Sequence, residues 1–213
     1  MKRLLLVLSA PSGGGKTTIA TKLLEARNDL GYSVSATTRA TRNGERDGVH
    51  YHFLSRPEFE RRQKNGEFVE WAEYGAQLYG TLQREIDGIF ASGRHAVLDI
   101  EIEGARQIRK NFSNSLQVFV LPPSAEVLVE RLTGRNTENP DILRKRLTRA
   151  SDELAAVAEY DYAVVNEDLD TAVEQIAAIL DGKADERLVS RQRNLPALVQ
   201  RLRRDVVKAA ERI

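Results

Sequence analysis

The sequence contains no cysteine and only one tryptophan among its 213 residues. The absence of cysteine excludes disulfides, a thiolate metal site and a cysteine nucleophile. The formal net charge is only +1, so no excess of one sign indicates a nucleic acid or an anionic membrane as partner. With 41% hydrophobic and 30% charged residues, the chain has the composition of one well-buried globular domain.

Long apolar runs are also missing. The basic start and the apolar run that follows it are similar to the opening of a signal peptide. However, the run stops at Ser9, and no small-residue cleavage site follows it. A buried strand explains these residues better, so we expect a cytoplasmic protein without a membrane partner.

Short apolar runs alternate with helical patterns along most of the chain. The apolar runs, which predict buried strands, cover residues 4–9, 96–100, 116–121 and, more weakly, 162–166. Helical patterns cover residues 17–28, 82–92, 103–112, 124–133 and 140–159. This alternation predicts an α/β fold, with a parallel sheet and helices on both of its faces.

Residues 33–79 break this alternation. Polar, alternating stretches at 48–54 and 67–74 predict strands, and Ser55-Arg56-Pro57-Glu58 is a capping-box pattern that predicts a short helix between them. The segment therefore reads as a small mixed α+β insert. Residues 134–139 are polar and rich in helix breakers, which is typical of a loop.

A glycine-rich turn joins the first predicted strand to the first predicted helix. It matches the phosphate-loop pattern G-x-x-x-x-G-K-[ST], with alanine at the first glycine position. Glycines let successive N–H groups point inward around a polyphosphate at a helix N-terminus. The expected ATP-binding residues here are Ala10, Pro11, Ser12, Gly13, Gly14, Gly15, Lys16, Thr17 and Thr18.

A phosphate loop also requires a magnesium site. The Thr17 hydroxyl is one expected ligand. The strand at 96–100 supplies an acid, Asp99, at the position where such proteins place a second ligand. We therefore expect Mg²⁺ as cofactor, held partly through water.

Seven ordered blocks make the sequence similar to the guanylate kinase family over nearly its whole length. They are residues 35–45, 48–53, 67–72, 78–81, 98–101, 131–138 and 164–170. The resemblance implies a phosphate-loop core (1–34 and 82–213) that includes a lid at about 132–148. It also implies a GMP-binding insert at 35–81, with ATP and GMP as the small-molecule partners.

The resemblance also implies roles for single residues. Arg39, Arg42, Tyr51 and Tyr79 match the clamp on the GMP phosphate, and Asn166 matches a residue beside the ATP base. The whole implied GMP set is Ser35, Arg39, Arg42, Tyr51, Glu70, Tyr79, Thr81 and Glu101, with Ser35, Glu70 and Glu101 as guanine readers. The implied catalytic set is Lys16, Arg39, Arg42, Arg131, Arg135 and Arg146.

Four positions depart from the family pattern. Thr41 stands where proline is usual, Glu101 where aspartate is usual, Glu103 where glutamine is usual and Asn136 where a lid glycine is usual. None of these changes removes a group that phosphoryl transfer requires. Glu101 is one methylene longer than aspartate, at a position that the resemblance assigns to guanine contact.

Other interpretations of the same residues stay open. A phosphate-loop kinase for another acceptor, such as a sugar phosphate, would keep Lys16 and Asp99. A phosphopeptide-binding module on the same scaffold would not need the intact Gly15-Lys16-Thr17. Taken alone, the arginines could be solvated surface and the tyrosines core. The histidines are His50, His52 and His95, and they lack ligand spacing, so no metal role is expected for them.

The C-terminal residues at about 195–213 predict a basic amphipathic helix. Its apolar face carries Leu198, Leu202, Val206, Ala209 and Ile213, and its basic face carries Arg201, Arg203, Arg204 and Lys208. Such a helix could bind a membrane, its own core or a second copy of the chain. Packing on the core or on a second subunit is favoured.

Overall fold

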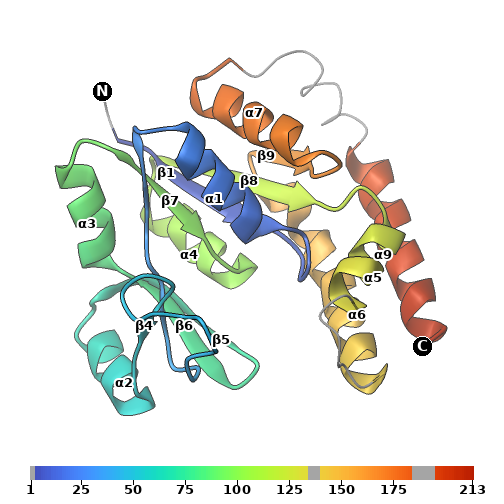
Figure 1. Ribbon diagram of the computed structural model, residues 1–213, viewed down its shortest axis with the longest axis horizontal. Helices are drawn as coiled ribbons and strands as arrows, with labels where there is room; N and C mark the ends of the chain where they lie inside the picture. Colours follow the sequence, from blue (N-terminus) through green and yellow to red (C-terminus); the bar gives the residue numbers. More distant parts are fainter. Residues whose placement is uncertain (1–2, 134–139, 184–194) are drawn as a thin grey trace. The chain divides into compact units, whose positions relative to one another are not determined.

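The computed structural model describes residues 3–133, 140–183 and 195–213 (Figure 1). The chain forms two compact units, which are described in turn. The first comprises Met1–Val7 and Ala26–Leu116, and the second comprises Leu8–Glu25 and Gln117–Ile213. Strands β1 (Leu5–Ser9) and β8 (Ser115–Leu121) each have residues in both units.

The first unit contains three strands of a mostly apolar sheet, in the order β2-β7-β1. Strand β2 (Leu30–Tyr32) pairs in parallel with β7 (His95–Asp99), so that Leu30 lies opposite His95. Every residue of β1 is buried, which explains why its sequence shows no polar alternation. Two helices of this unit, α3 (Gln83–Ala91) and α4 (Ile102–Asn111), bury apolar faces that include Ile86 and Ile108.

A second, four-stranded sheet of the first unit has the order β4-β3-β6-β5. Its strands are β3 (Ala36–Thr37), β4 (His52–Phe53), β5 (Phe68–Tyr74) and β6 (Gln77–Leu82). Strands β5 and β6 form an antiparallel hairpin. Its two-residue turn has φ 57° at Gly75 and 65° at Ala76, because a turn of this kind requires positive φ at both central positions.

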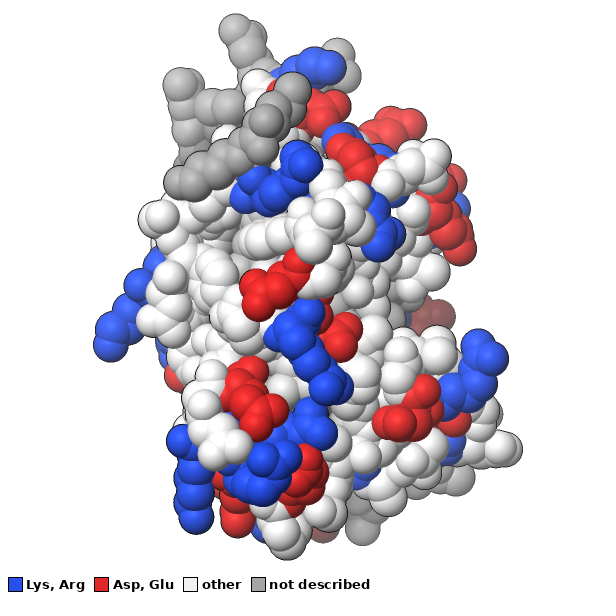
Figure 2. All heavy atoms as spheres, turned by 90° about the vertical axis from the view of Figure 1, so that its left-hand side faces the viewer, with Lys and Arg blue, Asp and Glu red and all other residues white. Residues whose placement is uncertain are grey.

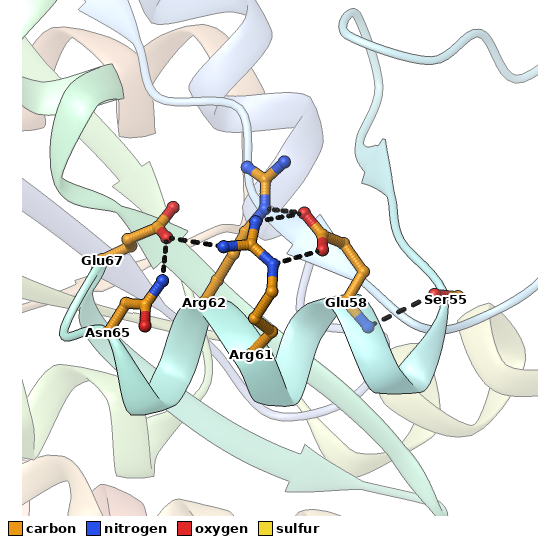
Figure 3. A network of polar contacts seen from close by, with 6 residues as sticks. All are labelled: Ser55, Glu58, Arg61, Arg62, Asn65 and Glu67. Atoms are coloured by element: carbon orange, nitrogen blue, oxygen red, sulfur yellow. Dashed lines mark hydrogen bonds and ion pairs between the residues drawn. The ribbon is translucent and has the colours of Figure 1, made fainter.

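Helix α2 (Arg56–Lys64) packs on this small sheet through Phe59, whose ring stacks on Phe68 with centroids 4.3 Å apart. As the sequence predicts, Ser55 caps the helix, and its Oγ accepts from the Glu58 N–H at 3.3 Å (Figure 3). The Glu58 carboxylate instead accepts from Arg61 Nε at 2.8 Å and Arg62 Nε at 2.7 Å. The hydrogen bond from Arg61, and after it the one from Arg62, lowers the pKa of Glu58 to about 2.

The second unit contains the strand order β1-β8-β9, and β8 pairs in parallel with β9 (Tyr162–Val165). Its helices are α1 (Lys16–Ala26), α5 (Ala125–Thr133), α6 (Pro140–Leu154), the 3-10 helix η1 (Ala155–Glu159), α7 (Leu169–Leu180) and α9 (Leu195–Glu211). Asp168 caps α7, since its carboxylate accepts from the Thr171 N–H at 2.8 Å. The α/β class with parallel strands and flanking helices is confirmed.

Helix α9 packs on α5 and α6 of its own unit (Figure 1). Leu202, Val206 and Ala210 are buried, and Arg203 Nε donates to the Ser151 carbonyl at 3.0 Å. The expected apolar face is therefore confirmed at Leu202 and Val206. Leu198, Ala209 and Ile213 are half-buried, and Ala210 is a further buried residue of this helix. Within the described residues, no helix has the length and apolarity needed to cross a membrane.

The two charge signs are mixed on the surface. On the face drawn in Figure 2, Lys and Arg side chains lie among Asp and Glu side chains, and neither sign forms a continuous field. Local ion pairs such as that of Lys22 with Asp170 also occur in the second unit. The mixed charge on this face agrees with the small net charge of the sequence.

We expect Leu202→Ala to lower the free energy of unfolding by about 2–5 kcal/mol, because it leaves a cavity between α9 and its neighbours. Val207→Ala on the same helix is the matched control, since Val207 is 41% exposed. That control should change the free energy by less than about 0.5 kcal/mol. Urea unfolding measures both, and equal effects of the two substitutions would contradict the packing described here.

Candidate active site

The glycine-rich turn between β1 and α1 is a curled loop. Gly13 and Gly15 have φ of 83° and 89°, a backbone conformation that residues with side chains rarely adopt. The Gly14 N–H donates to the Pro11 carbonyl at 2.8 Å and closes the turn. Among the described non-glycine residues only Ala76 has a positive φ, so Ala10 keeps an ordinary backbone. The loop therefore accommodates alanine at the first glycine position.

Side chains from two other parts of the second unit hold this loop. The Asn166 amide donates to the Gly14 carbonyl at 3.2 Å. Arg131 on α5 donates to the Asn166 carbonyl at 3.3 Å and reaches the Gly14 carbonyl at 3.5 Å. A Cβ at Gly15 would lie 2.5 Å from Asn166 Nδ2, so glycine is needed there for close approach as well as for its φ. The expected residues Arg131 and Asn166 are thus brought to the loop.

Helix α6 contributes two further contacts to the loop. Arg146, one of the expected catalytic arginines, reaches Ser12 Oγ at 3.4 Å. Glu153, which the sequence analysis missed, accepts from the Ser12 N–H at 2.9 Å through Oε2. Its other oxygen accepts from Arg149 Nε at 2.9 Å, and the side chain is 9% exposed. A buried carboxylate needs such partners, and it fixes the loop against α6.

The loop ends where α1 begins. Lys16 is the first residue of this helix, followed by Thr17 and Thr18, which are exposed. The unpaired N–H groups of a helix N-terminus attract anions, and a lysine at the same point adds a full positive charge. This end of the second unit is therefore suited to bind a polyphosphate.

A second cluster, in the first unit, surrounds Arg39. Its guanidinium donates to both oxygens of Glu45, from Nη1 at 3.0 Å and from Nη2 at 2.8 Å. The guanidinium also lies 5.3 Å from the centre of the Tyr51 ring. The Tyr51 and Tyr79 rings are 6.2 Å apart. Three of the four residues expected at the phosphate clamp are thus brought together.

Glu45 closes the turn that carries Arg42, the fourth residue expected at the phosphate clamp. Besides its fork to Arg39, the carboxylate accepts from the Arg42 N–H at 2.7 Å, and the Arg42 side chain is exposed. Thr41, where the family has proline, is exposed in this turn. The bonds of Glu45 hold the turn in the absence of proline. The sequence alone does not indicate this role, because an acid in a polar segment is ordinary.

Glu70 lies inside the first unit, on the hairpin of β5 and β6. It is 4% exposed and lies opposite Thr81, whose Oγ1 donates to Glu70 Oε1 at 2.6 Å. The neighbouring Trp71 points the other way and is 37% exposed, as strand alternation requires. An interpretation in which Glu70 is solvated surface is therefore wrong. Ser35 is buried too, at 8% exposure.

Asp99, at the carboxyl end of β7, accepts from the Tyr32 hydroxyl at 3.1 Å. Burial, together with the nearby Asp99 charge, raises the pKa of Tyr32, so the phenol stays a neutral donor. Tyr32 was missed by the sequence analysis, because the short strand that carries it was missed as well. Glu101 occupies the N-cap position of α4, but its side chain makes no capping bond.

The two proposed metal ligands belong to different units, Thr17 to the second and Asp99 to the first. Both offer oxygen atoms, which suit Mg²⁺, an ion that usually takes one or two protein ligands and completes its shell with phosphates and water. No group of three or more His, Cys, Asp or Glu within the described ranges is arranged to hold a metal. Arg135 and Asn136 lie outside those ranges.

Comparison with known proteins assigns the chain to a family. The model of the family described as guanylate kinase matches residues 2–183. The chain belongs to this family. The guanylate kinase of Carboxydothermus hydrogenoformans is 42% identical over 199 residues, covering 93% of this chain and 96% of that protein. The guanylate kinase of Paramagnetospirillum magneticum is 46% identical over 202 residues, covering 94% and 93%.

A solved structure gives the same result for the fold. The guanylate kinase of Anaplasma phagocytophilum superimposes with a TM-score of 0.70 at 34% identity, covering 85% of this chain and 86% of that one. Helix α9 lies beyond the residues that the guanylate kinase family model matches. The loop around Gly13 and Gly15 and the clusters at Arg39 and Glu70 all lie within them.

The bonds from Arg39, together with the Arg42 N–H, lower the pKa of Glu45 from 4.5 to about 2. A lowered pKa means that the pair stabilises the fold above about pH 4.5 and that this stabilisation is lost as the pH falls through about 2. We expect the Glu45 carboxyl carbon to titrate near pH 2 by ¹³C NMR, and Arg39→Gln to move its midpoint upward. A wild-type midpoint near 4.5 would show that the pair does not form in solution.

Proposed function

We propose that the chain transfers the γ-phosphoryl group of ATP to GMP, giving ADP and GDP. The observation that carries this proposal is the buried Glu70 carboxylate, which Thr81 orients from one side. A buried carboxylate held in one orientation is suited to a ligand that presents hydrogen-bond donors to it. Guanine is such a base, and the relatives named guanylate kinase support the choice.

Guanine presents two adjacent donors, N1–H and N2–H₂, beside its O6 acceptor. The two oxygens of Glu70 can accept from this pair, and the buried Ser35 hydroxyl can donate to O6. Adenine presents a lone pair at N1, so the same carboxylate would lose its partner there. Sites that read donors with buried polar groups typically discriminate by about 10⁴–10⁵ against ligands that lack them.

The phosphate of GMP is assigned to Arg39, Arg42, Tyr51 and Tyr79. Glu45 accepts from both Nη atoms of Arg39, so the guanidinium is already oriented within the cluster where a phosphate would bind. Guanidinium and phosphate groups form paired, charge-assisted bonds that fix orientation as well as affinity. Thr81 and Glu101 complete the proposed GMP set, Thr81 through its bond to Glu70.

ATP is assigned to the loop from Ala10 to Thr18, with Asn166 near its base. The geometry that supports this assignment is the curl at Gly13 and Gly15 in front of the α1 N-terminus. Lys16 would contact the outer phosphates. When bound at Thr17 and Asp99, Mg²⁺ would supply positive charge beside those phosphates.

In the reaction, an oxygen of the GMP phosphate bonds to the γ-phosphorus of ATP as the bond from that phosphorus to the β,γ-bridging oxygen breaks. The attacking oxygen is already anionic, so no general base is required. Arg131, Arg135 and Arg146 are proposed to offset the charge of the moving phosphoryl group. An arginine in that role is typically worth about 10³–10⁵ in rate.

The three-part division of the chain belongs to the same proposal. Residues 35–81 would bind GMP, and residues at about 132–148 would close over the phosphates and exclude water, which would otherwise hydrolyse ATP. We also propose that the protein acts in the cytoplasm, and that its substrates are free ATP and GMP. A sugar-phosphate kinase would have no use for the buried pair of Glu70 and Thr81, and a peptide-binding module would not need the loop at Lys16.

A substrate panel with Mg-ATP tests the function. We expect GMP to be phosphorylated and AMP, CMP and UMP to react at least about 10⁴-fold less efficiently, in the range expected of buried polar readers. Glu70→Gln should lower kcat/KM for GMP at least about 100-fold, because it removes the charge and places an amide donor against the donors of guanine. The KM for ATP should stay within about threefold.

Glu73→Gln is the matched control for Glu70→Gln. It lies on the same strand, but its side chain is 59% exposed. This control should keep the GMP activity of the wild-type protein. Efficient phosphorylation of AMP by the wild-type protein, or full GMP activity in Glu70→Gln, would contradict the proposed function.

A further inference from the structure

Gly104 has no conformational reason to be glycine. It lies in the first turn of α4 and does not have a positive φ. Glycine within a helix costs up to about 1 kcal/mol relative to alanine. The reason must therefore lie in what surrounds the residue.

The surroundings of Gly104 leave no room for a side chain. A Cβ there would lie 2.3 Å from Glu70 Oε2 and 2.9 Å from Glu70 Cδ. Contacts under 3.0 Å essentially never occur for a real Cβ, so the carboxylate would have to move. Its other oxygen, Oε1, is held by Thr81 at 2.6 Å, and the residue is 4% exposed. A buried and anchored carboxylate cannot swing aside at low cost.

The helix cannot move away from the strand either. One turn after Gly104, Gln107 binds the backbone of Trp71 twice. Its Oε1 accepts from the Trp71 N–H at 3.1 Å, and its Nε2 donates to the Trp71 carbonyl at 2.7 Å. Residues three apart share a face of a helix, so these two hydrogen bonds fix the spacing of α4 from β5 beside Glu70.

We propose that Gly104 is a specificity-determining residue, because its missing side chain forms the recess that holds the Glu70 carboxylate in place for guanine. This inference rests on the proposed function. Gln107 sets the distance between helix and strand, and the glycine leaves at that distance the space that one carboxylate oxygen fills. A methyl group at position 104 would displace Oε2 and strain the bond to Thr81.

Gly104→Ala tests the proposal, with Gly88→Ala as its matched control. Gly88 is also a helical glycine, in α3, but a Cβ there would meet nothing within 4 Å. We expect Gly104→Ala to raise the KM for GMP at least about 10-fold and to leave the KM for ATP within about twofold. Gly88→Ala should leave both unchanged.

A double variant separates a role through Glu70 from a general loss of structure. If Gly104 acts by placing that carboxylate, Gly104→Ala should add less than about twofold to the loss of GMP efficiency in Glu70→Gln, because coupled sites are not additive. Additive losses, an unchanged KM for GMP in Gly104→Ala, equal losses for ATP and GMP, or failure of that variant to fold would each overturn the proposal.

The substrate panel and the Gly104→Ala variant distinguish a failure of the proposed function from a failure of this inference. A wild-type protein that does not prefer GMP in the substrate panel would contradict the function itself. A wild-type protein that prefers GMP, together with a Gly104→Ala variant that binds it equally well, would contradict only the role of the glycine.

Discussion

The buried carboxylate of Glu70 is the constraint on which the first unit depends. An ionised group out of water is costly unless hydrogen bonds surround it. Thr81 supplies one of them at 2.6 Å, and the gap at Gly104 leaves room for the second oxygen. Gln107 then fixes the helix that provides this gap. The β5–β6 hairpin and α4 thus pack around one negative charge. This charge is suited to accept hydrogen bonds from the donors of a base.

Carboxylates have the same organising role at both proposed phosphate sites, although phosphate is itself negative. Glu45 holds the Arg39 fork and the Arg42 turn, and Glu153 holds the Ser12 N–H of the loop. Each acid is paired with an arginine, so it orients donors without leaving a buried charge unpaired. Arg39 and the Ser12 N–H are therefore oriented without a nucleotide, which lowers the cost of ordering them when one binds.

Much of the fold could be predicted from the sequence, because periodicity and glycine spacing are local signals. The phosphate loop and the cap at Ser55 follow from such patterns. Strand β2 was missed because three residues show no period, and α7 was missed although Asp168 precedes a helical pattern. In the site, Lys16 was identified from the phosphate-loop motif, and Arg39 and Glu70 were identified through the family resemblance. Glu153 and Gly104 could not be, since their roles arise from contacts between segments far apart in the chain.

The central claim is that Glu70 reads two donors of guanine, and the binding of GMP and inosine 5′-monophosphate compares them directly. Inosine monophosphate keeps N1–H and O6 but lacks the N2 amino group, so one carboxylate oxygen would lose its partner. A hydrogen bond to a charged group is worth about 1.5–3 kcal/mol, which is about 10- to 150-fold in affinity. By isothermal titration calorimetry with the wild-type protein, we expect inosine monophosphate to bind at least about 10-fold more weakly than GMP. Equal dissociation constants for the two nucleotides would contradict the account.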